Sequence, residues 1–483
     1  MRYRGSKNRG FAMYQPPRYR GRRRRPSLLL VIAGILCVIA LSALAAGAIH
    51  QAQADYQPPA TPDPNPGQTA VNPPVPVQNT SQDPEPTYPS IAPEPEPSPD
   101  PKPTPVNAVE NTGGFELPIE GTHGIALVNL KLYSDHTDTR SGGNLPAGTA
   151  FTILREDKDR VLVSLQDGSR AWADKNDIMV NRPDLIPSMI YKNSNAEGSL
   201  MKNLGMDLDG ITGRQLYRSK VYNERLGRDE FIMPVQYHMA KKLMQAQQIA
   251  KAQGLTVVLY EGFRPHDTQM AVADALQRLA KTNPDTKLSI QKNGFNISYY
   301  INTGISSHQM GSAVDVSLAQ VDSWEDRSFH GYSVSVPASF TEYFYCEIVT
   351  NSANGVRFSS ELRYGPALPE NTANCMPTPM HELSYLSGSF TGPTKTYTAG
   401  AWKTALKNGT VKRAEFWTDG AQTLQDIFVE ADMEPLASEW WHFNDLAAWS
   451  MAKKANAAGE FEVGTQLFSM TPADAAALAE PVQ

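Results

Sequence analysis

An uncharged run of 22 residues, Leu28 to Ile49, constrains this 483-residue chain more than any other feature. As a helix, 22 residues are enough to cross a hydrocarbon core of about 30 Å. Residues 1–25 contain nine Arg, one Lys and no acid, and four of these Arg directly precede the run. By the positive-inside rule we expect residues 1–25 to be a basic cytoplasmic tail and residues 26–50 a transmembrane signal-anchor helix.

The alternative to a retained anchor is a signal peptide, because Ala52-Gln53-Ala54 resembles a cleavage site. The protein would then be secreted. In both cases residues 51–483 lie outside the cytoplasm, either on the cell membrane or in the medium. The dense basic cluster abuts the apolar run, so it predicts a membrane partner and argues against nucleic acid.

Proline dominates the next segment, because 18 of the chain's 37 prolines lie between Pro58 and Pro105. They alternate with Asp, Glu, Thr and Ser, a composition that cannot bury a core and favours an extended polyproline II spacer. Residues 51–113 are therefore predicted to be a disordered, Pro-rich linker. It would hold the following domains away from the bilayer, towards a cell wall.

Short strands are predicted in residues 114–182, at 124–133, 150–155, 160–165 and 170–173. This pattern indicates a small all-β barrel. The segment resembles bacterial SH3-like domains in Asn129-Leu130-Lys131-Leu132-Tyr133, Leu145-Pro146-Ala147-Gly148-Thr149, Asp167-Gly168 and Trp172. The resemblance implies binding of peptidoglycan through this SH3-like domain. The alternative is a spacer barrel without a ligand.

Residues 183–465 alternate helix and strand without regular βαβ repeats, which predicts an α+β domain. A helical pattern follows Pro234 and ends near Gly254, and a second runs from Asp267 to Lys281. A β-branched strand, 256–260, lies between them, and another strand is expected at 313–318. Residues 466–483 are assigned to a C-terminal tail.

Two short motifs carry the chemistry of this domain. His308 and Asp315 are seven residues apart, across a turn that contains Gly311, and Glu439 precedes His442 by three residues. Two His, one Asp and a nearby Glu are the set that a catalytic zinc site needs, because three ligands leave a position for water and the Glu accepts its proton. Alternation along the strand predicts that Asp315 faces a cleft while Val314 and Val316 enter the core.

Arg264 follows a strand end and precedes Pro265, so its position is fixed. It could stabilise the negative charge that develops in peptide hydrolysis. The alternative is a salt bridge to Glu261.

Residues from about 205 to 450 resemble the D-alanyl-D-alanine dipeptidases, the vancomycin-resistance type of zinc D,D-peptidase. The resemblance rests on four motifs in the family's order: Thr212-Gly213-Arg214-Gln215-Leu216-Tyr217, Tyr260-Glu261-Gly262-Phe263-Arg264-Pro265, the loop from Ser306 to Asp315, and Glu439-Trp440-Trp441-His442. It implies that His308, Asp315 and His442 bind one Zn²⁺. It also implies that Glu439 is the general base, that Arg264 stabilises the transition state, and that Ser306 lies near the substrate.

This chain departs from the family at the expected substrate-binding residues Glu261, His381 and Glu382. Glu261 stands where the family commonly has Asp, and His381, followed by Glu382, stands where an Asp holds the free amine of the substrate. The substrate is therefore either the free dipeptide D-Ala-D-Ala or a cell-wall stem peptide ending in D-Ala-D-Ala. A non-catalytic wall-binding or sensing protein is the remaining alternative.

The 123 residues between Asp315 and Glu439 exceed what compact members of the family use, and they contain Cys346 and Cys375. Outside the membrane segment these are the two cysteines of the chain. An oxidising compartment permits a disulfide between them, which would tie the insert as a lid. The alternative is two unpaired thiols.

Overall fold

The computed structural model describes residues 114–350, 364–391, 401–461 and 463. The expected cytoplasmic tail, signal-anchor, Pro-rich linker and C-terminal tail (residues 1–113 and 466–483) lie outside the described residues. Within the described ranges, no helix is both long and apolar enough to cross a membrane.

The first part of the described chain forms a six-stranded antiparallel sheet, the N-terminal sheet, in the order β13-β7-β1-β4-β5-β6. Its strands are β1 (His123–Ala126), β4 (Ala150–Asp157), β5 (Arg160–Ser164), β6 (Arg170–Asp174), β7 (Ile178–Asn181) and β13 (Pro234–Gln236). A two-stranded ribbon of β2 (Leu130–Leu132) and β3 (Gly143–Leu145) accompanies it. Strands β4, β5 and β6 lie where the sequence predicts them, whereas the strand predicted at 124–133 is divided into β1 and β2. The edge strand β13, however, comes from the segment that the sequence assigns to the next domain.

A second sheet, the central sheet, has the order β23-β24-β15-β14-β8, with β16 also paired to β15. Its strands are β8 (Ile190–Tyr191), β14 (Leu255–Glu261), β15 (Ala313–Phe329), β16 (Tyr332–Glu342), β23 (Glu434–Pro435) and β24 (His442–Asn444). The β8–β14 pair is parallel and the other pairs are antiparallel. The strand predicted at 313–318 continues to Phe329. It then turns through His330 and Gly331, both with positive φ, into β16.

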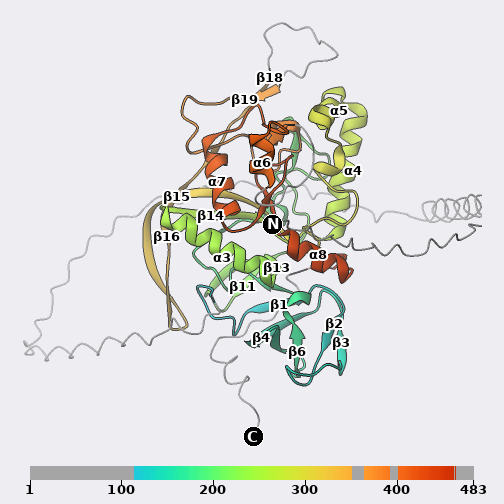
Figure 1. Cartoon of the computed structure of the whole chain (residues 1–483), viewed down its shortest axis with the longest axis vertical. Helices are drawn as coiled ribbons and strands as arrows, with labels where there is room; N and C mark the ends of the chain where they lie inside the picture. Colours follow the sequence, from blue (N-terminus) through green and yellow to red (C-terminus); the bar gives the residue numbers. More distant parts are fainter. Residues whose placement is uncertain (1–113, 351–363, 392–400, 462, 464–483) are drawn as a thin grey trace, which may run out of the picture. The chain divides into compact units, whose positions relative to one another are not determined.

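Seven helices lie in the described residues (Figure 1): α2 (Ser194–Glu197), α3 (Tyr237–Ala252), α4 (His266–Thr282), α5 (Pro284–Gln291), α6 (Ala401–Lys407), α7 (Asp419–Glu430) and α8 (Leu446–Lys454). The two predicted helices correspond to α3 and α4. Met239, Leu243 and Ala250 recur at helical spacing in α3 and are all buried, so this face packs on β14 and against α7. The region is therefore mixed α and β, as predicted.

Short strand pairs complete the described secondary structure: β9 (Lys202–Asn203) with β10 (Met206–Asp207), β11 (Lys220–Asn223) with β12 (Arg228–Phe231), β17 (Phe344–Tyr345) with β20 (Cys375–Met376), β18 (Ile348–Thr350) with β19 (Tyr364–Pro366), and β21 (Phe390–Thr391) with β22 (Lys412–Arg413). One cluster of buried apolar side chains runs through both sheets, from Phe151 to Val316 and Trp440. The N-terminal sheet and the central sheet thus share a continuous core.

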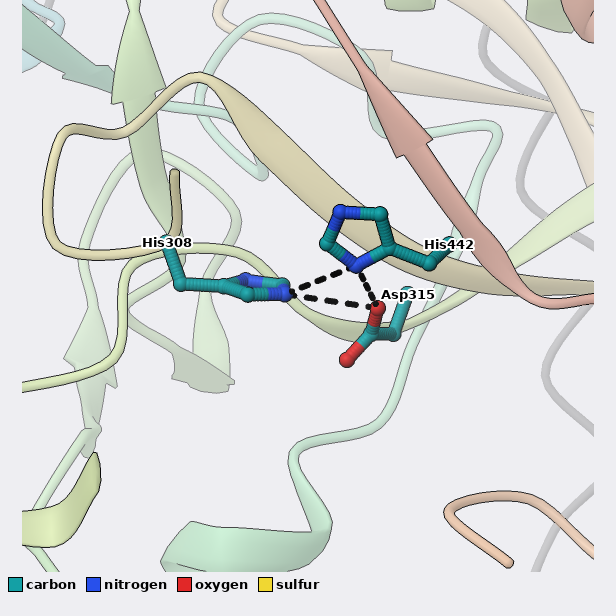
Figure 2. Close-up of side chains that lie close together, drawn as sticks. All are labelled: His308, Asp315 and His442. Atoms are coloured by element: carbon teal, nitrogen blue, oxygen red, sulfur yellow. Dashed lines mark hydrogen bonds and ion pairs between the residues drawn. The ribbon is translucent and has the colours of Figure 1, made fainter. Parts of the chain in front are cut away.

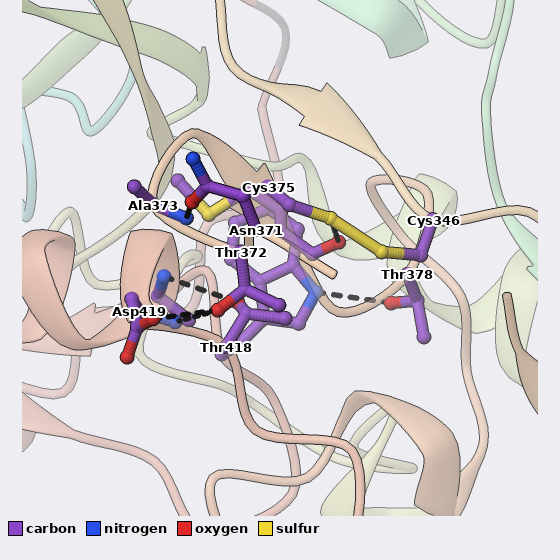
Figure 3. Close-up of a disulfide and its surroundings, with 11 residues drawn as sticks. Cys346, Asn371, Thr372, Ala373, Cys375, Thr378, Thr418 and Asp419 are labelled. Atoms are coloured by element: carbon purple, nitrogen blue, oxygen red, sulfur yellow. Dashed lines mark hydrogen bonds between the residues drawn. A yellow bond between two sulfur atoms is a disulfide. The ribbon is translucent and has the colours of Figure 1, made fainter. Parts of the chain in front are cut away.

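A disulfide joins Cys346 and Cys375, whose Cα atoms are 6.6 Å apart (Figure 3). The same segment is attached to the start of α7, because the Thr372 hydroxyl donates to Asp419 Oδ2 at 2.7 Å and Gly420 N donates to Thr372 O at 2.9 Å. The disulfide therefore ties β20 to the residue after β17, and the Thr372 hydrogen bonds hold the same segment beside α7.

Candidate functional site

Strand register brings three polar side chains of the central sheet to one place. Asp315 on β15 lies directly opposite Glu261 on β14 and opposite His442 on β24. Side chains of directly opposed residues project from the same face of a sheet, a few ångströms apart. The strands thus place Asp315 between a carboxylate and an imidazole, although 127 residues separate it from His442 in the chain.

His308 completes a three-residue group from the loop before β15. Its Nε2 lies 3.4 Å from Asp315 Oδ1 and 3.2 Å from His442 Nδ1, and His442 Nδ1 lies 3.0 Å from Asp315 Oδ1. Figure 2 shows the three side chains converging on one point. All three are buried, and their ligand atoms meet the spacing required to hold one metal ion. Gly311 permits the approach of this loop, because its φ is +61° and an added Cβ would lie 2.7 Å from Met179 Sδ.

The donor set fits zinc. Nitrogen and oxygen ligands about 2.0–2.2 Å from a tetrahedral zinc ion lie about 3.3–3.6 Å from one another, close to the separations seen here. The second nitrogen of each imidazole is also held: His308 Nδ1 donates to Gly262 O at 2.7 Å, and His442 Nε2 donates to Asn444 Oδ1 at 3.1 Å. These acceptors fix the tautomers that leave lone pairs on His308 Nε2 and His442 Nδ1, as in protein metal sites.

The other oxygen of Asp315, Oδ2, accepts hydrogen bonds instead. His381 Nε2 lies 3.1 Å away and Arg264 Nη2 lies 3.3 Å away. Burial opposes ionisation of Asp315, but the electrostatic effect of His308 and the hydrogen bond from His381 Nε2 hold its pKa well below the usual value. Arg264 also pairs with Glu261 and donates to Gln269 Oε1 at 2.7 Å. Asp315 is therefore an ionised carboxylate with one oxygen turned towards the other two residues of the group.

Glu439 lies beside this group, with Oε2 3.7 Å from His442 Nδ1. Burial, together with the negative charge of Asp315, raises the pKa of Glu439 well above its usual value. The turn that holds Glu439 is fixed by Trp440, whose N–H donates to Ser387 O at 2.9 Å and whose Nε1 donates to Thr378 Oγ1 at 3.0 Å. A buried carboxylate with a high affinity for protons is suited to general acid–base chemistry.

The three-residue group and Glu439 line one pocket of about 320 Å³, a size suited to a small ligand. Arg264, Ser306 and Glu439 line it together with His308, Asp315, His381 and His442. The remaining wall includes the apolar and aromatic residues Met201, Tyr299, Tyr300, Ile301, Ile305, Leu383, Leu436, Trp441, Leu446 and Trp449. The Ser306 hydroxyl has no hydrogen-bond partner among the described residues, so it is available to a ligand.

Two predicted substrate-binding residues do not line this pocket. Glu261 is fully buried, pairs with Arg264 and accepts from Asn195 Nδ2 at 2.5 Å. Glu382 points away from the pocket and accepts from the backbone N–H groups of Leu204, at 2.5 Å, and Gly205, at 3.0 Å. Arg264 forms the salt bridge to Glu261 and also lines the pocket, so its role in stabilising negative charge stays a prediction.

Sequence reasoning missed the residues that hold the site in place: Asn195, Gln269 and Asn444. Of these, Asn444 carried a readable signal. It lies two residues after His442, and residues i and i+2 of a strand share a face, so a strand at this position would have placed the two side chains together. Asn195 and Gln269 depend on packing between distant segments.

Comparison with known proteins agrees with this geometry. The model of the D-ala-D-ala dipeptidase family matches residues 209–329, about a quarter of the chain. The match contains Arg264, His308 and Asp315 and ends before His381, Glu439 and His442. Peptidases of this family are zinc-dependent, so the match supports a peptidase, and His308, Asp315 and His442 form a buried group that could hold a metal ion. A search of curated protein sequences finds no match to the chain.

Proposed function

We propose that this protein is a membrane-anchored, extracytoplasmic zinc metallopeptidase that hydrolyses D-Ala-D-Ala or related cell-wall peptides. The observation that carries the proposal is the convergence of His308 Nε2, Asp315 Oδ1 and His442 Nδ1 beside Glu439 in one pocket. The family match over residues 209–329 supports the choice of a D-Ala-D-Ala peptide as substrate.

His308, Asp315 and His442 would hold the zinc ion, which supplies Lewis-acid chemistry when bound. Glu439 acts as the general base that takes a proton from the attacking water and then returns it to the leaving amine. Its raised proton affinity suits it to hold that proton between the two steps. Arg264 lines the same pocket, and its positive charge favours the negative charge that develops on the scissile carbonyl oxygen.

Release of D-Ala by the purified full-length chain, loaded with zinc, tests this function. The substrates are D-Ala-D-Ala and a pentapeptide ending in D-Ala-D-Ala. Glu439→Gln keeps the shape of the side chain but cannot accept a proton, so kcat should fall about 10²- to 10⁴-fold while zinc remains bound. The exposed Glu224→Gln is the matched control. Near-normal turnover by Glu439→Gln would exclude Glu439 as the base.

A second candidate, a D-Ala-D-Ala carboxypeptidase acting on peptidoglycan stem peptides, is favoured by the charges in the pocket. Asp315 and Glu439 are the only carboxylates among the described residues that line it. His381, at the position where the family has an amine-binding Asp, is engaged with Asp315 Oδ2. The ammonium group of a free dipeptide would therefore lack a carboxylate partner, whereas an acylated peptide needs none.

The ratio of kcat/KM values for an N-acetylated pentapeptide and for D-Ala-D-Ala ranks these two substrates. A higher value for the free dipeptide would exclude the carboxypeptidase. No D-Ala release from either peptide, from a chain that contains stoichiometric zinc, would exclude both activities. Wall binding or sensing would then be the remaining function.

Anchoring and wall binding are parts of the same proposal. The uncharged run from Leu28 to Ile49, after nine Arg, supports a retained anchor, and the short strands of residues 114–182 support a peptidoglycan-binding module. Fractionation of cells tests the anchor, because full-length protein found only in the medium would indicate cleavage. Sedimentation of the full chain with purified peptidoglycan tests wall binding. A point variant is used rather than deletion of residues 114–182, because these residues share a core with the rest of the described chain. Substitution of Arg170, the exposed residue of β6, leaves this core intact, and unchanged sedimentation of that variant would count against wall binding through β6.

A further inference from the structure

His381 lines the pocket, but its side chain is buried and its backbone conformation is uncommon. It is 1% exposed and adopts a positive φ of 62°, a backbone conformation that His tolerates better than most residues. Its ring makes a T-shaped contact with Trp441, with ring centroids 5.9 Å apart and planes at 78°. Backbone and packing thus hold the imidazole in one orientation, directed at Asp315 rather than at the open pocket.

Both ring nitrogens of His381 have partners that define its tautomer. Nε2 lies 3.1 Å from Asp315 Oδ2, and Nδ1 lies 3.4 Å from the Ser194 hydroxyl. An ionised carboxylate can only accept, so Nε2 carries the hydrogen and Nδ1 accepts from Ser194. This chain of contacts, Ser194 to His381 to Asp315, ends on the carboxylate oxygen that is turned away from His308 and His442.

We infer that His381 is a positioning residue that, by donating to Oδ2, holds Asp315 so that only Oδ1 is presented to a metal ion. This inference rests on the metal site of the proposed function. Without the His381 donor, Oδ2 keeps only the longer contact from Arg264 Nη2, at 3.3 Å, and that guanidinium is shared with Glu261. The carboxylate could then rotate, and the ordered arrangement of the three ligand atoms would be lost. Partners of this kind, which orient ligands, typically contribute 10- to 100-fold to metal affinity.

An Asp at position 381 would have the opposite effect. It would add a third carboxylate beside Glu261 and Asp315, which already share the single cation of Arg264. Repulsion between the new carboxylate and Oδ2 would turn Asp315 rather than hold it. In this chain the His therefore supplies a hydrogen-bond donor to a metal ligand at a position where an Asp would supply a repelling charge.

Zinc affinity of the full-length chain, measured by competition with a chromogenic chelator, tests the inference. His381→Asn tolerates the positive φ but lacks a donor at the Nε2 position, and it should bind zinc about 10- to 100-fold more weakly. His381→Gln places its amide N–H near the Nε2 position and should remain within a few-fold of wild type. The exposed His238→Asn, on α3, is the matched control. Thermal denaturation of the zinc-free proteins separates a loss of folding from a loss of zinc binding.

Zinc binding by His381→Asn as tight as that of wild type would overturn the inference, and so would equal losses in His381→Asn and His381→Gln. The proposed function fails in a different way. If wild type binds zinc and His381→Asn binds it weakly, but no peptide is cleaved, the positioning role stands and the peptidase does not. If wild type binds no more zinc than His308→Ala, both fall.

Discussion

The Nδ1 atom of His308 lies 2.7 Å from the carbonyl oxygen of Gly262, which directly follows strand β14. This contact joins the loop before β15 to the end of the neighbouring strand. It also fixes the imidazole with Nε2 directed at Asp315 and His442. The orientation of one metal-binding nitrogen is thus set by a backbone group in a turn whose residues also include Glu261 and Arg264.

Gly262→Ala should therefore weaken zinc binding without removing any ligand. An added Cβ would lie 2.9 Å from Arg182 Nη2 and 3.3 Å from Pro234 O, so the turn must shift and move the carbonyl that holds His308. We expect zinc affinity to fall about 10-fold, measured by chelator competition. Gly142→Ala is the control, because nothing lies within 4 Å of its Cβ position.

A variant of Arg182 tests the steric cause of this effect, because Arg182 Nη2 is the atom nearest to the added Cβ. Its guanidinium is fully buried, and burial lowers its pKa to about 9. In the Gly262→Ala background, Arg182→Met removes the closest atom and should restore part of the zinc affinity. If the double variant binds zinc as weakly as Gly262→Ala alone, the obstruction comes from the Pro234 backbone instead.

The candidate site could be predicted in large part because its residues come in local pairs. His308 with Asp315, and Glu439 with His442, are each separated by only a few residues, so spacing alone indicates that each pair shares one location. The meeting of the two pairs depends on β15 pairing with β24, over 127 residues of sequence. Local pattern does not specify such pairing, and it was the family resemblance that supplied it.

The sequence does not show in which direction a side chain points, so the predicted substrate-binding residues were less reliable than the metal ligands. His381 and Glu382 are adjacent, and the sequence assigned both to the substrate, but His381 lies in a turn with a positive φ, and the two side chains reach different partners. His381 accordingly faces Asp315, and Glu382 holds the turn at Leu204. The continuation of β15 to Phe329, and its hairpin with β16, also went unpredicted, because consecutive polar residues there break the alternation that indicates a strand.

A buried polar network around Asp184 joins the N-terminal sheet to strand β11. Asp184 Oδ2 lies 2.6 Å from His123 Nδ1, and Asp184 Oδ1 accepts from Asn181 and Asn223 at 3.0 and 2.6 Å. Burial opposes ionisation of Asp184, but His123 and the other donors lower its pKa below the usual value. The network therefore ties β1, β7 and β11 together around one charge.

Asp184→Ala should lower the free energy of unfolding by about 3–5 kcal/mol at pH 7, because it leaves the buried donors without an acceptor. Urea denaturation, followed by tryptophan fluorescence, measures the change. The exposed Asp159→Ala is the control and should change the free energy by less than about 0.5 kcal/mol. A loss below about 1 kcal/mol in Asp184→Ala would contradict the structural role of the network.

Removal of the disulfide should destabilise the insert. Cys346 and Cys375 are 29 residues apart, and closing a loop of this length typically contributes about 2–4 kcal/mol to stability. The double variant Cys346→Ser/Cys375→Ser should therefore unfold at a lower temperature than wild type by circular dichroism. Reductant should lower the Tm of wild type but leave that of the double variant unchanged. Complete thiol labelling of native wild type without reductant would contradict the pairing.

The stability of the folded protein should depend on pH through the carboxyl group of Glu434. Burial is the main cause that raises the pKa of Glu434 to about 7, and the nearby Asp445 and Asp432 add to it. In the unfolded chain a Glu carboxyl ionises near about 4.3, so between these values the folded protein binds the extra proton. The contribution of Glu434 to stability is therefore most favourable below about pH 4.3 and is lost as the pH rises to about 7.

Glu434→Gln removes this dependence, since an amide stays neutral and its oxygen can still accept from Leu446 N, now 3.2 Å from Glu434 Oε2. The variant should be more stable than wild type at pH 8, and the difference should shrink towards zero at pH 5. Urea denaturation at the two pH values measures it, with Glu430→Gln, at the exposed last residue of α7, as the matched control. An equal difference at pH 5 and pH 8 would show that packing, rather than the charge of Glu434, is responsible.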